Sequence, residues 1–162
     1  MSQFERIIRR LLDHGVEFVV IGGYAAVLHG AIDVTRDLDI CCPMTEANLL
    51  KLQAALDAIR PRHRLTLHDA PLELRPGRCD GWRNLYLQTD EGVLDCLGEV
   101  LAVGGYEQAL AMSDIASTTF GDFHLLNIPT LIEAKEAVGR PHDLRTVVQL
   151  RCVLETKLRS AE

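Results

Sequence analysis

Residues Val19 to Cys42 read VVIGGYAAVLHGAIDVTRDLDICC, and this stretch decides the fold. It joins an apolar run, a Gly22-Gly23 turn, a short helical segment and a second apolar run that contains Asp37 and Asp39. Residues two apart in a strand point to the same face, so the two aspartates are predicted to lie side by side. Like charges that close repel unless a cation lies between them, and Mg²⁺ is the ordinary cation for such carboxylates.

The Gly22-Gly23 turn follows an expected strand at residues 16–21 and precedes an expected helix from Tyr24 to His29. Glycine has no Cβ, so a ligand can approach the backbone, and the N-terminus of a helix presents unpaired N–H groups. This order of strand, glycine turn and helix is typical of a phosphate-binding turn. Neither a G-x-G-x-x-G dinucleotide motif nor a Walker A loop occurs.

A third carboxylate, Asp95, lies in the middle of the apolar run Val93–Leu97. A buried carboxylate is costly unless it is paired or bound to a metal, so this residue is predicted to need a cation. Three carboxylates could hold two metal ions for phosphoryl or nucleotidyl transfer. Taken singly, Asp37 and Asp39 could be a solvated strand end, the glycines an ordinary turn, and Asp95 an exposed edge residue. Their combination and order favour a nucleotide site.

Hydrophobic periodicity and turn residues predict the other elements. The expected helices, besides residues 24–29, cover residues 4–12, 46–59, 130–138 and 143–158. The expected strands cover residues 16–21, 37–42, 62–68, 84–88, 93–97 and 124–128, with a hairpin turn at residues 89–92 and a loop at residues 69–81.

The chain has 162 residues, of which 48% are hydrophobic, and no Pro/Gly/Ser-rich linker divides it. It is expected to be one domain, residues 1–162, with a core at about 4–128 and a helical part at about 129–158. The net charge of −6 and a pI near 5.5 disfavour a protein that binds long nucleic acid through its overall field. A nucleotide or a locally held nucleic-acid end remains open.

The start of the chain has charges throughout, and no apolar run approaches membrane-spanning length. We therefore expect no signal peptide and no membrane contact. The five cysteines form an odd set without C-x-x-C spacing. Reduced thiols in a cytoplasmic protein are the simplest interpretation, and a zinc site is disfavoured.

Several of these motifs together resemble the DNA polymerase β-like nucleotidyltransferase superfamily. More narrowly, they resemble its small prokaryotic members, the minimal nucleotidyltransferases and the AbiEii-type toxins of toxin–antitoxin systems. The resemblance runs from about Phe4 to Leu150. It rests on Gly22-Gly23, Tyr24-Ala25-Ala26, His29-Gly30, Thr35-Arg36-Asp37-Leu38-Asp39-Ile40, Asp95, Leu131-Ile132-Glu133-Ala134-Lys135 and Gly139-Arg140-Pro141-His142-Asp143.

The resemblance implies an α/β (α+β) nucleotidyltransferase fold, a mixed sheet flanked by helices with further helices at the C-terminus. It implies that Gly22 and Gly23 hold the triphosphate of an NTP such as ATP, and that Asp37, Asp39 and Asp95 ligate two Mg²⁺ ions. Asp95 would also help to deprotonate the acceptor hydroxyl. Gly23 departs from the many members that have serine there, a change typical of the branch that this chain resembles.

Other polar residues have two interpretations each. Thr35 could donate to a phosphate or only end a loop, and Arg36 could neutralise a phosphate or be solvated. Lys135 could give the site a compact positive charge, or lie exposed beside Glu133 or Glu136.

Three further residues are expected to be structural first. His29 is a helix-terminal or core histidine, and Arg140 and Asp143 either pair with each other or fix the junction of the last two helices. A basic cluster could receive an RNA end or an acidic partner, or simply be solvated. Its members are Arg60, Arg62, His63, Arg64, Arg75, Arg78 and Arg83.

The expected function is Mg²⁺-dependent transfer of a nucleoside monophosphate from an NTP to a hydroxyl on tRNA or protein, with release of pyrophosphate. The small size favours a toxin–antitoxin enzyme with a cognate toxin or antitoxin protein. One alternative is a module of the same fold that binds a nucleotide or a partner without turnover. Another is a small-molecule nucleotidyltransferase that modifies an antibiotic.

Overall fold

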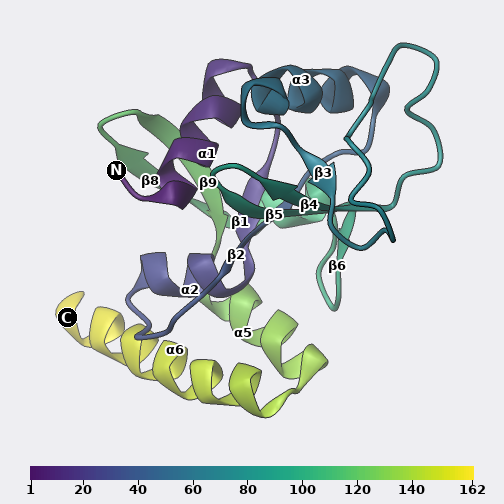
Figure 1. Cartoon of the computed structure of the whole chain (residues 1–162). Helices are drawn as coiled ribbons and strands as arrows, with labels where there is room; N and C mark the ends of the chain where they lie inside the picture. Colours follow the sequence, from purple (N-terminus) through teal and green to yellow (C-terminus); the bar gives the residue numbers. More distant parts are fainter.

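The computed structural model describes residues 1–162 and contains one seven-stranded sheet (Figure 1). The strand order is β3-β4-β5-β2-β1-β9-β8. The strands are β1 (Val19–Ile21), β2 (Asp37–Cys41), β3 (Arg62–His63), β4 (Asn84–Thr89), β5 (Gly92–Leu97), β8 (Ser113–Thr118) and β9 (Gly121–Leu126). A separate two-stranded hairpin contains β6 (Glu99–Val100) and β7 (Gly104–Gly105).

The sheet is mixed, because β2 is parallel to β5 and β1 is parallel to β9, whereas the other pairs are antiparallel. In Figure 1, α1 and α3 lie above the strands, and α2, α5 and α6 lie below them. The helices are α1 (Gln3–Asp13), α2 (Gly22–His29), α3 (Glu46–Leu56), the 3₁₀ turn η1 (Asp57–Ile59), α4 (Tyr106–Ala111), α5 (Ile128–Val138) and α6 (Pro141–Ser160). The predicted class, α/β (α+β) with a flanked mixed sheet and C-terminal helices, is confirmed.

Local signals set most helix boundaries. The hydroxyl of Thr45 accepts from the Asn48 N–H and so caps the start of α3. The side chain of Asn127 caps α5 in the same way. Gly30 and Gly139 end α2 and α5 in the left-handed conformation, with φ of 114° and 70°, which glycine adopts at little cost.

The central strands are buried, as their apolar sequence predicts. All three residues of β1 are buried, and they belong to a core cluster of 36 residues that extends from Ile7 to Leu150. The strand is shorter than the expected 16–21, since regular pairing begins only at Val19. Even α6, the longest helix, is too polar to cross a membrane, and no other helix is both long and apolar enough to do so.

One predicted strand is wrong in its extent, and the elements β8 and α4 were not predicted. The expected strand at residues 62–68 consists of Arg62–His63 alone. The chain turns after it because the Thr66 hydroxyl donates to the His63 carbonyl and accepts from the Ala70 N–H. The edge strand β8 was not expected, because its sequence SDIAST is polar and mostly exposed, and only pairing with β9 makes it a strand. The short helix α4 was missed as well.

Candidate active site

The sheet places Asp39 and Asp95 opposite each other on the parallel strands β2 and β5. Ile21 of β1 lies opposite Asp39 on its other side, and Tyr86 of β4 lies opposite Asp95. Paired residues on neighbouring strands share a face, and Asp37 lies two residues before Asp39 on that same face. The three predicted carboxylates therefore lie together on one face of the sheet.

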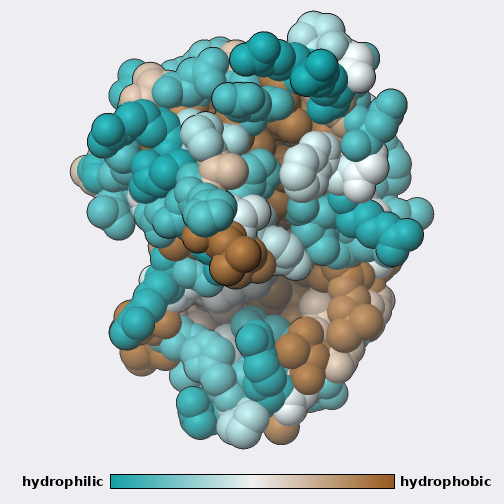
Figure 2. Space-filling view, turned by 45° about the vertical axis from the view of Figure 1, so that its right-hand side comes forward, coloured by the Kyte–Doolittle hydropathy of each residue, from teal (hydrophilic) through white to brown (hydrophobic).

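A pocket of about 750 Å³ lies over these carboxylates. Figure 2 shows the molecule hollowed across its middle, between the body that carries the sheet and the part built of helices. Strands β1, β2 and β5 contribute to the pocket, as do α2, α5 and the start of α6. All eight predicted site residues line it: Gly22, Gly23, Thr35, Arg36, Asp37, Asp39, Asp95 and Lys135.

Glycine is required at the turn for steric reasons. Gly22 has φ of +68°, and a Cβ there would lie 2.4 Å from Oδ2 of Asp39. A Cβ at Gly23 would lie 3.0 Å from Oγ1 of Thr35. The helix α2 starts at Gly22 itself, and no side chain caps its N-terminus. Backbone N–H groups at this end are thus available to an anion in the pocket.

The carboxylates are electrostatically strained without a cation. Burial, together with the neighbouring charges of Asp95 and Asp37, raises the pKa of Asp39 to about 7, although Lys135 and Arg64 act in the opposite direction. Burial also raises the pKa of Asp95. An all-oxygen donor set of this kind fits Mg²⁺, which prefers carboxylates. In the arrangement described, no three His, Cys, Asp or Glu side chains converge closely enough to hold a metal ion.

The guanidinium of Arg64 is bound to Asp95, which partly explains why the carboxylates do not converge on one point. Its Nη2 donates to Oδ2 at 2.5 Å and its Nε to Oδ1 at 3.2 Å. The guanidinium also lies over the ring of Tyr86, 5.5 Å from the centroid. The solvated interpretation of Arg64 is therefore wrong, and so is an exposed edge position for Asp95, which is 6% exposed on an interior strand.

The sequence offered only a weak signal for Arg64. It belongs to the basic cluster, and the turn that follows β3 brings it to the carboxylates. Its backbone N–H donates to the Tyr86 carbonyl at 3.0 Å, which continues the pairing of this segment with β4. Asp95 was predicted to need a cation, and in this structure the guanidinium of Arg64 is that cation.

Lys135 lies buried in the helical wall of the pocket, with 7% exposure. Its Nζ is 3.6 Å from Oδ1 of Asp143, and Nε of Arg140 is 2.7 Å from Oδ2 of the same carboxylate. The alternative of an exposed lysine beside Glu133 or Glu136 is wrong. The predicted pairing of Arg140 with Asp143 is confirmed, and it holds the junction between α5 and α6.

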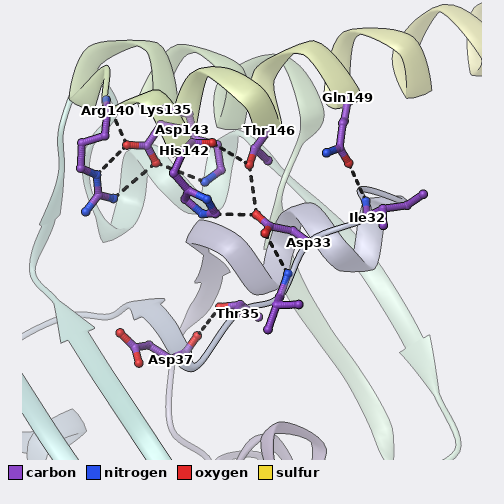
Figure 3. A network of polar contacts seen from close by, with 11 residues as sticks. Ile32, Asp33, Thr35, Asp37, Lys135, Arg140, His142, Asp143, Thr146 and Gln149 are labelled. Carbon is purple, nitrogen blue, oxygen red and sulfur yellow. Dashed lines mark hydrogen bonds and ion pairs between the residues drawn. The ribbon is translucent and has the colours of Figure 1, made fainter.

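A polar network ties the loop before β2 to α6 (Figure 3). Oδ2 of Asp33 accepts from the Thr146 hydroxyl at 3.1 Å and lies 3.3 Å from Nε2 of His142. The Ile32 N–H donates to the side chain of Gln149 at 2.6 Å. Sequence reasoning missed this loop anchor, because residues more than 100 positions apart form it.

The loop carries Thr35 and Arg36 into the pocket. The Thr35 hydroxyl donates to the Asp37 carbonyl at 3.0 Å, which agrees with its role in ending the loop, and its contact with a phosphate stays a prediction. Arg36 is exposed, as its solvated interpretation requires. His29 is structural, as expected, because its Nε2 lies 2.8 Å from the Leu126 carbonyl and burial lowers its pKa.

In comparisons with known proteins, no family model matches this chain, and no curated protein matches it significantly. The function is therefore argued from the geometry of the pocket.

The steric requirement at the turn can be tested with two glycines of similar conformation. Gly22→Ala is expected to lower the free energy of unfolding by about 3 kcal/mol, because the new methyl group meets a carboxylate. Gly77→Ala is the matched control: its φ is +77°, yet nothing lies within 4 Å of the added Cβ. For Gly77→Ala we expect the free energy of unfolding to fall by only about 1 kcal/mol, because backbone strain is the only cost. Equal losses in urea denaturation would contradict the close approach of Gly22 to Asp39.

The strain at Asp39 predicts a pH dependence of stability. Its pKa of about 7 exceeds the ordinary 3.8, so the folded protein holds this proton more tightly than the unfolded chain does. Without divalent cations, wild-type stability should fall as pH rises from 4 to 7. Asp39→Asn should lack this loss and be more stable than wild type at pH 8 by about 4 kcal/mol. Asp122→Asn, at an exposed aspartate of β9, should unfold like wild type throughout, and a wild-type pH slope in Asp39→Asn would refute the assignment.

Proposed function

We propose that this protein is an Mg²⁺-dependent nucleotidyltransferase that moves a nucleoside monophosphate from an NTP to a hydroxyl of RNA or protein. The observation that carries the proposal is the meeting of three carboxylates, an uncapped helix N-terminus that begins with two glycines, and a buried lysine in one pocket. Carboxylates for Mg²⁺ and positive groups for phosphates are the components that phosphoryl transfer needs.

The reaction that we propose is a displacement at the α-phosphorus. The acceptor hydroxyl oxygen forms the new P–O bond, the bond to the oxygen that bridges the α- and β-phosphates breaks, and pyrophosphate leaves. Asp95, once released from Arg64, takes the hydroxyl proton. Asp37, Asp39 and Asp95 would hold Mg²⁺, which supplies positive charge to the phosphate oxygens.

The other residues of the pocket position the nucleotide. The N–H groups at Gly22 and Gly23 would donate to phosphate oxygens, and Lys135 would offset their charge from the opposite wall. Asp143 and Arg140 hold Lys135 at that wall. The similarity of these motifs to DNA polymerase β-like nucleotidyltransferases supports the same assignment. A place in a toxin–antitoxin system, with a cognate partner protein, is part of the proposal.

A second candidate function is nucleotide binding without turnover. The ion pair between Arg64 and Asp95 favours it, because a guanidinium satisfies the third carboxylate without any metal ion. In that case NTP should stabilise the protein against heat, and no nucleotide should be transferred to any acceptor.

Transfer can be measured with α-labelled NTPs, Mg²⁺ and mixtures of tRNA and lysate protein as acceptors. With wild type, label should appear on an acceptor. Asp37→Asn or Asp39→Asn should lower the rate by at least about 1,000-fold, because the variant loses a ligand for the Mg²⁺ that offsets the phosphate charge. Asp122→Asn should transfer at the wild-type rate. Unchanged labelling in the pocket variants would exclude this site, and wild-type heat stabilisation by NTP without label would favour the second candidate.

Because Arg64 binds Asp95, a variant of Arg64 can distinguish the two candidate functions by the response of stability to Mg²⁺. Arg64→Gln should lower stability without divalent cations by about 2 kcal/mol, because Asp95 loses its partner. If Mg²⁺ binds at Asp95, added MgCl₂ should restore most of that loss in thermal unfolding. Arg60→Gln is the matched control, because it removes an exposed bidentate pair with Asp90 and should change stability little at any Mg²⁺ concentration. Equal Mg²⁺ responses in wild type and Arg64→Gln would contradict a cation site at Asp95.

A further inference from the structure

A second pocket, of about 1150 Å³, adjoins the candidate active site. Its walls are the residues that enter β4, chiefly Trp82 and Arg83, and the β6–β7 hairpin from Glu99 to Gly104. The hairpin projects below the strands in Figure 1, beside the label β6. Four residues line both pockets: Asn84, Glu99, Val100 and Leu101. The two pockets therefore share a wall, and a molecule in the second pocket lies next to the pocket that holds the three carboxylates.

An aromatic platform stands in the wall of this second pocket. Trp82 is the only tryptophan of the chain and is 38% exposed. His63 stacks on it, with ring centroids 5.2 Å apart and an angle of 16° between the planes. Stacking on one face helps to hold the indole in place, and Trp82 also lines the pocket. A partly exposed indole in a pocket is a surface on which a planar base can stack.

The charge around this platform is opposite to that of the chain. Residues 60–83 contain six arginines and three acidic residues, whereas the whole chain has a net charge of −6. Arg60 and Arg62 pair with Asp90, and Arg64 pairs with Asp95. The three remaining arginines, Arg75, Arg78 and Arg83, are exposed. None of these three takes part in an ion pair, so they are available to an external anion.

The backbone holds Arg83 at the rim of the second pocket. The Gly98 N–H donates to the Arg83 carbonyl at 2.9 Å. A Cβ at Gly98 would lie 2.7 Å from that carbonyl oxygen, so the close approach depends on glycine. Arg83 and Trp82 are consecutive and line the same pocket, which gives a positive group directly beside an aromatic face.

We propose that the second pocket binds the end of a single-stranded RNA and presents its terminal ribose hydroxyl to the active site. This inference rests on the proposed function and names its acceptor. A base stacks on Trp82, and Arg83, with Arg75 and Arg78 beyond it, contacts the phosphates. Glu99 and Asn84, at the boundary of the two pockets, accept hydrogen bonds from the ribose hydroxyls, which distinguish RNA from DNA.

The chemistry of the pocket favours RNA over a protein acceptor. Exposed arginines alone suit any polyanion, including an acidic peptide. A tryptophan beside them suits a polyanion that also carries planar bases, because base stacking contributes binding energy that an acidic peptide lacks. The single negative side chain of the second pocket, Glu99, also lines the active-site pocket.

The single tryptophan makes a direct test available. A ten-nucleotide single-stranded RNA, titrated into the full chain without NTP, should quench the fluorescence of Trp82, and the affinity should fall as salt rises. Arg83→Gln should weaken binding about tenfold and reduce the slope of log K against log [salt] by about 0.7. Arg159→Gln, at an exposed arginine near the end of α6, should bind like wild type. Circular dichroism checks that both variants are folded.

The possible outcomes separate this inference from the proposed function. RNA quenching that Arg83→Gln weakens, with an acidic peptide and a DNA of the same sequence clearly weaker, supports the RNA site. Absence of quenching, or equal quenching by the acidic peptide, overturns it. Since Asp39→Asn lies outside the second pocket, it should retain RNA binding while it loses transfer. Label on a protein acceptor, without RNA binding, would leave the proposed function standing and remove the RNA site.

Discussion

The register of the parallel strands β2 and β5 is the constraint on which the rest of the site depends. It puts Asp39 opposite Asp95, and the two-residue repeat of a strand adds Asp37 to the same face. Burial is the main reason that the pKa of Asp39 rises to about 7, and the charges of Asp95 and Asp37 act in the same direction. The positive charges of Lys135 and Arg64 act on Asp39 in the opposite direction.

Two positively charged side chains, Arg64 and Lys135, lie on opposite sides of the pocket. Arg64, at the turn after β3, binds Asp95 directly, whereas Lys135 acts on Asp39 at a distance from α5. Lys135 is itself held by Asp143, a buried carboxylate whose pKa is lowered by Arg140 and Lys135 despite its burial. Arg64 and Lys135 thus offset only part of the negative charge of the site, and the direct pair at Asp95 is one that a divalent cation could replace.

The helical part of the molecule shapes the pocket as well as closing the fold. Asp33 binds Thr146 and lies beside His142, so the loop that enters β2 is attached to α6 (Figure 3). A change in the position of α6 would therefore move the start of the carboxylate strand. On the other side, the β6–β7 hairpin separates the candidate nucleotide pocket from the one proposed for RNA and contributes residues to both.

Sequence by itself determined the local features of this protein. The alternation in Asp37-Leu38-Asp39, the two glycines that begin α2 and the N-cap Thr45 act over a few residues, so the local pattern gives the central strands, these helix starts and the shared face of Asp37 and Asp39. Asp95 was predicted because it interrupts an apolar run, and Gly22 and Gly23 because they lie at a strand-to-helix turn, whereas Thr35, Arg36 and Lys135 each had a structural alternative. Only the tertiary structure decided which charges meet. Arg64 reaches Asp95, and Asp33 reaches Thr146, across separations that no local pattern records, because the sheet register and the packing of α6 set those distances. The edge strand β8 is a further case, since its polar sequence becomes a strand only through its hydrogen bonds with β9.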